Sequence, residues 1–498
     1  MSTLPPDSAP RARRADTVRR RVARAWALLL ALLLNACSVG PDFSRPPSPG
    51  VDRFVQGDAL RTPLQAAGSV QTFSAQTNVP SDWWTRFGSL AIDSAVDEAL
   101  TGNATIEGAQ AALRQSEDEM RAGAGVFYPQ VDAGFAGSRQ KYSPSRIGAN
   151  EPSTLFNLFT LSASVSYALD IWGGQRRMVE ALQARVDAQR YTVLATYLTL
   201  TVNVVNAMIA RAAYRDEIAA TREMTALVRE QIRITQAQVE AGASAYAAVL
   251  TLENELATLE ASLPALEQKR AQAEDLLASL SGMLPVEWHA PDLSLEDITL
   301  PHTLPETVPA SLVRRRPDIL QAEAALHVAS ANIGVATANL LPGVTLSASG
   351  GYDNTSMSAL LHRSGQIWTI AADVSAPVFH GGTLWFQRRA ALDAYAQTRA
   401  SYRQVVLSAF AQVADTLRAL ENDAQALDAQ TRARDAAAEA LRLVEADYAA
   451  GTVGYVQTLI ADGLFHQARI AWLQGVAQRL QDTVALYAAL GGGWESNQ

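Results

Sequence analysis

The sequence predicts a mainly α-helical protein with a small antiparallel β part, built from two copies of one large unit. Two segments, 175–239 and 384–449, contain no proline, and each would form a helix of roughly 95 Å at 1.5 Å per residue. Four shorter segments alternate apolar with small polar residues, a period typical of strands. Short motifs also recur in one order at offsets of 208 to 213 residues, which indicates a duplication.

The alternating segments predict two strand pairs. Leu161, Ala163, Val165 and Tyr167 alternate with threonine and serine, and a partner strand is expected at 131–135, joined through the polar segment 138–157. The second pair is expected at 344–349 and 368–376. One apolar and one small-polar face fit a lipid-facing outer-membrane barrel, and they fit a soluble sandwich equally well.

Four strands cannot close a barrel, and an open sheet edge cannot lie in hydrocarbon. The strands are therefore either outside the membrane or pooled among several chains. Two chains would give eight strands and three would give twelve, and both even numbers are allowed.

The spacing of apolar residues in the helical segments indicates which side of each helix packs against its neighbours. Residues 89–125 are expected to be helical and to end at Gly125 and Pro129. The segment after the first long helix spaces its apolar residues alternately by four and three, which predicts a coiled-coil seam, with a kink expected at Pro264. The members of that seam are Leu252, Leu256, Leu259, Leu263, Leu266, Arg270, Ala273, Leu277 and Leu280. Tyr395 and Tyr402, with apolar residues at helical spacing after them, are interpreted as packing.

The first 37 residues predict export. Seven arginines precede the apolar run 25–34, which has the length of a signal-peptide core and is too short to span a bilayer. The following Leu34-Asn35-Ala36-Cys37 resembles a bacterial lipobox, in which Cys37 becomes the acylated first residue; the alternative is an ordinary signal peptide with an incidental cysteine. By resemblance to sorted lipoproteins, Ser38 favours the outer membrane.

Composition excludes several classes of function. Cys37 is the single cysteine, so the chain has no disulfide framework. Residues 1–36 hold seven of the 41 basic and two of the 50 acidic residues, which leaves 34 and 48 and changes the net charge from −9 to −14. An acidic exported chain does not favour nucleic acid as a partner. The six histidines are far apart, and neither a nucleotide-binding loop nor a nucleophile elbow occurs. The sequence therefore predicts no enzyme, no metal site and no cofactor apart from the lipid.

Several segments together resemble the TolC-like outer-membrane factor family, in its NodT/OprM-like lipoprotein branch. They are Cys37-Ser38-Val39-Gly40-Pro41-Asp42-Phe43, Asp82-Trp83-Trp84 with Phe87, Arg314-Arg315-Arg316-Pro317-Asp318 with Ile333-Gly334 and Leu341-Pro342, and Ala489-Leu490-Gly491-Gly492-Gly493-Trp494. The resemblance implies a homotrimer with one twelve-stranded transmembrane barrel and a long helical tunnel. It also implies a periplasmic adaptor (a membrane fusion protein), an inner-membrane pump of the RND type and outer-membrane lipid as partners.

The resemblance further implies that the helical-hairpin tips form the aperture. The adaptor-docking tips would be Gly242, Ala243 and Ser244 in one unit and Gly451, Thr452, Val453 and Gly454 in the other. Tyr246, Tyr455 and Asp462 are the aperture candidates. The family pattern places an acidic residue and an arginine where this chain has Ile460 and Gly463, so Asp462 is a displaced candidate for the constriction.

The preferred function is a passive outer-membrane exit duct of a tripartite efflux or secretion system. The alternative is a lipid-anchored periplasmic helical scaffold or adaptor; a third possibility, a lipoprotein hydrolase, lacks a catalytic constellation. The predicted organisation is a signal peptide over 1–36, a lipidated extended tether over 37–80, repeat unit one over 81–285 with a β-hairpin near 128–170, a linker over 286–305, repeat unit two over 306–494 with a β-hairpin near 342–379, and a tail over 495–498.

Overall fold

A computed structural model describes residues 38–55, 64–66, 69–74, 79–143, 152–305 and 309–493. The predicted signal peptide, Cys37 and Trp494 lie outside these ranges. The chain divides into two compact units. Unit 1 comprises residues up to 45 together with 116–186 and 324–399, and unit 2 comprises 46–115, 187–323 and 400–498.

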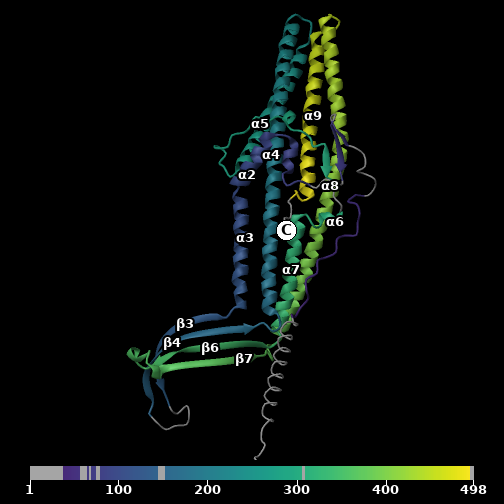
Figure 1. Ribbon diagram of the computed structural model, residues 1–498. Coiled ribbons are helices and arrows are strands. Elements are labelled where there is room, and N and C mark those ends of the chain that lie inside the picture. Colours follow the sequence, from purple (N-terminus) through teal and green to yellow (C-terminus); the bar gives the residue numbers. More distant parts are fainter. Residues whose placement is uncertain are drawn as a thin grey trace, which may run out of the picture. The chain divides into compact units, whose positions relative to one another are not determined.

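Unit 1 contains a four-stranded antiparallel sheet (Figure 1). Its strands are β3 (Gln130–Tyr142), β4 (Thr154–Leu169), β6 (Gly343–Asn354) and β7 (Gln366–Ser375), in the order β3-β4-β6-β7. The predicted strands are confirmed. The joining segment predicted at 138–157 is too long, because residues 138–142 pair with 154–158 and continue the strands. Short 3-10 turns, η5 (Met357–Ala359) and η6 (Arg363–Gly365), lie between β6 and β7.

The strand register gives this sheet two chemically different faces. One row across all four strands is apolar, and the neighbouring row on the opposite face is polar. The apolar row is Val131, Val165, Ala348 and Ile370, and the polar row is Asp132, Ser164, Ser349 and Thr369. Because side chains alternate faces along a strand, the whole apolar set predicted from the sequence lies on one side.

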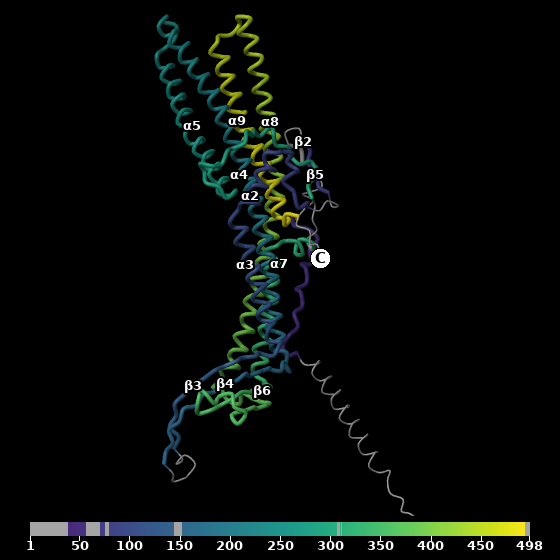
Figure 2. The backbone as a smooth tube through the Cα atoms, turned by 60° about the vertical axis from the view of Figure 1, so that its left-hand side comes forward, coloured from purple at the N-terminus to yellow at the C-terminus, as the bar shows by residue number. Residues whose placement is uncertain are grey.

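The long predicted helices are present. α4 (Gly174–Glu240) and α8 (Thr383–Ala449) have 67 residues each, and α5 (Tyr246–Leu280) and α9 (Tyr455–Ala489) have 35 each. In unit 2 they form two antiparallel hairpins, α4–α5 and α8–α9, whose turns lie at the same end of the unit in both views (Figures 1 and 2). α4 also includes one window that is long and apolar enough to cross a membrane. Of that window 44% is buried, and α4 contributes the fully buried Val204, Val205 and Met208 to the core.

The predicted coiled-coil seam of α5 is confirmed. Its apolar positions from Leu252 to Leu280 are buried or half-buried, whereas most intervening residues are exposed. Ion pairs between Arg222 and Glu267 (2.6 Å) and between Arg229 and Glu260 (2.8 Å) join α5 to α4. Pro264 lies inside α5 without ending it, and the kink expected there stays a prediction. In α8, Tyr402 is buried in the core, as expected for a packing residue.

The single helix predicted over 89–125 is wrong in one respect, because it is divided. α2 (Leu90–Gly102) and α3 (Ala104–Gly123) are separated by Asn103, and η2 (Ala124–Phe127) follows. The Asn103 side chain accepts hydrogen bonds from the backbone N–H groups of Thr105 and Ile106 and donates one to the Leu280 carbonyl. Asparagine is a strong N-cap, so it begins a new helix here while bonding the end of α5.

A second, three-stranded sheet in unit 2 was not predicted. β1 (Leu64–Ala66) pairs antiparallel with β2 (Ser69–Ser74), and β2 pairs parallel with β5 (Thr303–Pro305). Part of the predicted extended tether therefore forms β-strands, namely β1 and β2. The remaining short elements of unit 2 are η1 (Trp83–Phe87), η4 (Leu295–Asp297) and α6 (Pro309–Leu312), and α7 (Pro317–Ala338) begins in unit 2.

An aromatic cluster in the unit 2 core packs the Trp83 motif against the C-terminal part of α9. Trp83 and Phe87 are almost fully buried, and the Trp83 ring stacks on Tyr487 with centroids 5.3 Å apart. The arginine cluster before Pro317 also serves packing. Arg316 is buried and donates hydrogen bonds to both carboxylate oxygens of Asp318 and to the Ala489 carbonyl.

Candidate functional site

The two hairpin turns of unit 2 have the same backbone geometry. At the first turn the N–H of Ala243 donates to the Gln238 carbonyl and that of Gly242 to Val239, and at the second turn Thr452 and Gly451 repeat the pattern. These paired bonds form a Schellman motif, which requires a left-handed residue after the helix. Gly242 (φ 70°) and Gly451 (φ 73°) supply it.

The turn residues lie at the surface. Gly242, Ala243, Gly451, Thr452 and Gly454 are exposed, and Ser244 and Val453 are half-buried. A Cβ on Gly242 or Gly451 would meet open space, so a partner has room to approach closely. The residues before α5 and α9, Ala245 and Gly454, make no side-chain cap, and the first N–H groups of both helices are therefore not capped by side chains.

The two tyrosines that begin α5 and α9 differ in their surroundings. Tyr246 is 60% exposed. Tyr455 is half-buried because its ring packs against Tyr448, with centroids 5.2 Å apart. The two tyrosines therefore occupy matching positions at the start of their helices, but their side chains make different contacts.

Asp462 points into a polar cluster between α9 and α4. Its side chain is 20% exposed, and its Oδ1 lies 3.4 Å from Nε2 of the buried His466. Glu223 on α4 lies 3.7 Å from Nδ1 of His466 and forms a 2.6 Å ion pair with Arg469. Burial, together with Glu445 and Glu223, outweighs the attraction of His466 and raises the pKa of Asp462. Sequence reasoning had not joined Asp462 to His466, although their spacing of four predicts neighbours on a helix.

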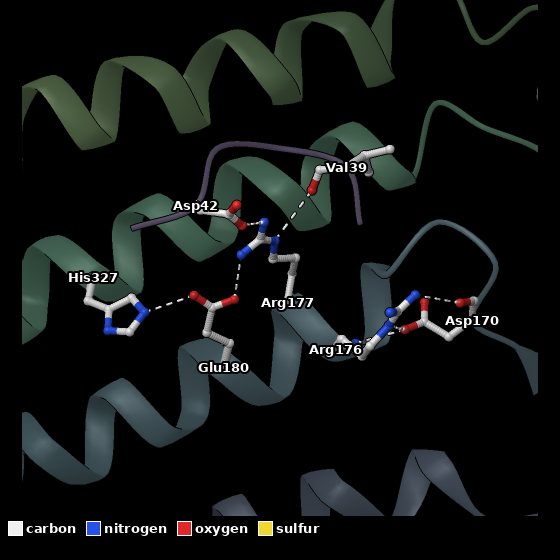
Figure 3. Close-up of polar contacts among 7 residues, drawn as sticks. All are labelled: Val39, Asp42, Asp170, Arg176, Arg177, Glu180 and His327. Carbon is white, nitrogen blue, oxygen red and sulfur yellow. Dashed lines mark hydrogen bonds and ion pairs between the residues drawn. The ribbon is translucent and has the colours of Figure 1, made fainter. Parts of the chain in front are cut away.

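A second candidate site in unit 1 holds the segment that follows Cys37 (Figure 3). We call Asp42, Arg177, Glu180 and His327 the anchor clasp. Buried Arg177 donates to the Asp42 carboxylate, to the Val39 carbonyl at 3.4 Å and to Glu180 at 2.7 Å. Glu180 also lies 2.8 Å from Nε2 of His327. The clasp thus fixes residues 39–42 against α4 and α7.

Packing and charge both support the clasp. Burial opposes the charges of Arg177 and Glu180, but their mutual hydrogen bonds, with those to Asp42 and His327, raise the pKa of Arg177 and lower that of Glu180. The Phe43 ring stacks on His327 with centroids 4.3 Å apart. A Cβ on Gly40, whose φ is 92°, would collide with the backbone of Gly334. Gly40, Asp42, Phe43 and Gly334 belong to motifs found in the sequence, but their contacts with one another and with Arg177 and His327 were not predicted.

Within the described ranges, no group of three or more histidine, cysteine or acidic side chains is arranged to hold a metal ion. The arrangement instead offers surface turns, a helical bundle and a sheet with one apolar face.

Comparisons with known proteins agree with this arrangement. The sequence model of the family described as outer membrane efflux protein matches residues 95–283 and 308–492. The pyoverdine export outer membrane protein OpmQ of Pseudomonas aeruginosa is 29% identical over 84% of this chain and 88% of its own length. The probable outer membrane lipoprotein SilC of Salmonella typhimurium is 25% identical over 93% of this chain and 97% of its own length. The solved structure of the outer-membrane channel OprN has a TM-score of 0.81 and 26% identity, covering 92% of this chain and all of that one.

The fold and these similarities define a channel protein of the bacterial outer membrane that serves as an exit duct and is not an enzyme. The chain belongs to the outer membrane efflux protein family. The family and exit-duct function expected from the sequence are therefore confirmed, and the scaffold and hydrolase alternatives are not supported. The lipid, the tips and the aperture residues stay predictions.

Proposed function

We propose that three copies of this chain form one duct through which solutes leave the cell passively. One observation carries the proposal. The antiparallel sheet of unit 1 has two edges, β3 and β7, with no partner strand among the described residues. Its apolar face is largely exposed: Val131, Trp368, Ile370 and Val374 are 70%, 73%, 76% and 69% exposed.

Joining β7 of one copy to β3 of the next satisfies both edges and continues the up-and-down order. Strands of 10 to 16 residues are long enough to cross a bilayer when tilted, for which about 9–11 residues are needed. Closure also removes unpaired backbone groups from hydrocarbon. The proposal is a twelve-stranded transmembrane barrel with the apolar row facing lipid.

The family match in two blocks, at 95–283 and 308–492, supports an internal duplication. So do the equal lengths of α4 and α8 and of α5 and α9. In the proposed trimer the two hairpins of each chain would give six similar hairpins around one axis. Their turns, 242–244 and 451–454, would dock a periplasmic adaptor that is fed by an inner-membrane pump.

Cys37 is proposed to carry the lipid anchor. The clasp fixes the chain within five residues of it, so the acyl chains would be held near the ends of β4 and β6, where Trp172 donates a 2.7 Å hydrogen bond to the Pro342 carbonyl. A relative named as a lipoprotein supports this proposal.

The test compares the full-length protein with a Cys37→Ala variant. The wild type is expected to run as an oligomer on unboiled gels, to become monomeric on boiling, and to form ion-conducting pores in planar bilayers. Cys37→Ala is expected to lose the lipid, seen by mass spectrometry, but still to require detergent for extraction because of the barrel. A monomeric, non-conducting protein that Cys37→Ala releases without detergent would refute the duct.

A further inference from the structure

The exposed residues of α9 form one uncharged stripe. Between Tyr455 and Ala489 they are Gln457, Ile460, Leu464, Gln467, Gln474 and Gln478. Their spacings of three, four and seven place them on one side of the helix. Surface helices normally expose charged residues, so a stripe of glutamines with two apolar residues is unusual.

The two apolar members of this stripe follow Gln457 and lie in the second and third turns of α9. Ile460 and Leu464 are 56% and 58% exposed and are four residues apart, so their side chains are neighbours. Beyond them the stripe continues with glutamines, which suit a water-filled tunnel wall. The two apolar residues therefore lie between Gln457, which is nearer the hairpin turn, and the three glutamines further along α9.

Asp462 lies on a different side of α9. It is two positions along the chain from both Ile460 and Leu464, which corresponds to roughly 200° of rotation about the helix axis. Its carboxylate contacts His466 and lies near Glu223 and Glu445. The His466 contact is within α9 itself, and the Asp462 side chain is only 20% exposed, so Asp462 faces the helices of its own chain.

We propose that the constriction of this duct is an apolar ring of Ile460 and Leu464 from three copies, and that Asp462 lies outside this ring. The proposal rests on the trimeric duct proposed above. Apolar side chains can meet at an axis and exclude water, which closes a pore by dewetting, whereas three carboxylates there would repel one another. The closed duct is therefore expected to lack a cation-binding ring at this point.

The first experiment measures single-channel open probability in planar bilayers. Ile460→Ser and Leu464→Ser are each expected to raise it several-fold, because a hydroxyl allows water into the ring. Ile460→Leu, which preserves the apolar character, is the matched control and should behave as wild type. Leu407→Ser, at a leucine of α8 that is 63% exposed, controls for loss of a surface leucine elsewhere.

The second experiment places a carboxylate in the ring. Ile460→Asp is expected to create block by millimolar Mg²⁺ that the wild type lacks, and Asp462→Asn is expected to leave the response to Mg²⁺ unchanged. The apolar ring is wrong if Asp462→Asn alters cation block or if both serine variants keep the wild-type open probability. Absence of conduction and of a heat-sensitive oligomer in the wild type would instead refute the duct itself, so the two failures are distinguishable.

Discussion

A buried arginine in unit 2 fastens the three-stranded sheet to the helices. Arg479 is 1% exposed, and its guanidinium donates to the Leu420 carbonyl and to the side-chain oxygen of Gln71 on β2. Gln71 in turn donates a 2.8 Å hydrogen bond to the Pro301 carbonyl. Burial lowers the pKa of Arg479 to about 10, so the residue remains charged at neutral pH.

The neighbouring Asp482 makes stability depend on pH. Burial and the adjacent Asp423 raise the pKa of Asp482 to about 7 from 3.8. The folded protein therefore keeps a proton between these values that the unfolded chain releases. The stabilising contribution is complete below about pH 4 and is lost as pH rises towards 7, with a slope of at most about 1.4 kcal/mol per pH unit.

The measurement is the thermal unfolding midpoint of the detergent-solubilised protein from pH 5 to pH 8. The wild-type midpoint should fall over this range, while Asp482→Asn should flatten the curve and exceed wild type at pH 8. Asp428→Asn, at an exposed carboxylate of α8, should change little. An unaltered slope in Asp482→Asn would contradict the assignment.

At the scale of the elements, α5 tolerates a proline because of its packing. Pro264 has no N–H, so the Glu260 carbonyl loses its bond within the helix. The Glu260 side chain nevertheless pairs with Arg229 on α4, and the half-buried seam continues on both sides of the proline. Contacts between helices therefore offset a local cost.

Pro264→Ala is expected to restore this bond and to stabilise α5 by up to about 3 kcal/mol. Amide hydrogen exchange over residues 258–268 should slow relative to wild type. Gln268→Ala, an exposed position one turn further on, serves as the control and should have little effect. Faster exchange in Pro264→Ala would indicate that the proline is required for the packing of α5 on α4.

At the scale of the whole molecule, the two faces of the sheet would contact different surroundings in the proposed barrel, with lipid on the apolar face and water on the polar face. Ile370 and Thr369 are adjacent on β7 and belong to the apolar and polar rows respectively. A lysine in place of Ile370 would face lipid, at a cost of about 2–4 kcal/mol at mid-membrane. A lysine in place of Thr369 would face the lumen.

Ile370→Lys is therefore expected to reduce the amount of heat-sensitive oligomer recovered from outer membranes, and Thr369→Lys is expected to leave it unchanged. In bilayers, Thr369→Lys should lower the conductance for cations relative to that for anions, because it adds positive charge to the lumen. Equal recovery of both variants would show that the apolar row does not face lipid.

Local patterns predicted the strands and long helices well because each of these elements depends on a pattern among consecutive residues. The period of two in 161–167 places its apolar residues on one face, and the observed register agrees. The absence of proline in 175–239 matched an unbroken α4. The β2–β5 pairing was missed because it is short and joins Thr72 to Thr303, and the division at Asn103 was missed because an asparagine also occurs inside helices.

The sequence by itself predicted an export signal and determined the alternating strands, the glycine turns and the family, since each depends on residues close together or on an ordered set of motifs. Tertiary structure alone decided which side chains meet. Asp42, Arg177 and His327 come from three separate segments, and Asp462 contacts the buried His466 while Ile460 is 56% exposed. Spacing along one helix gives the side on which a residue lies, but only packing against other helices decides which side is buried.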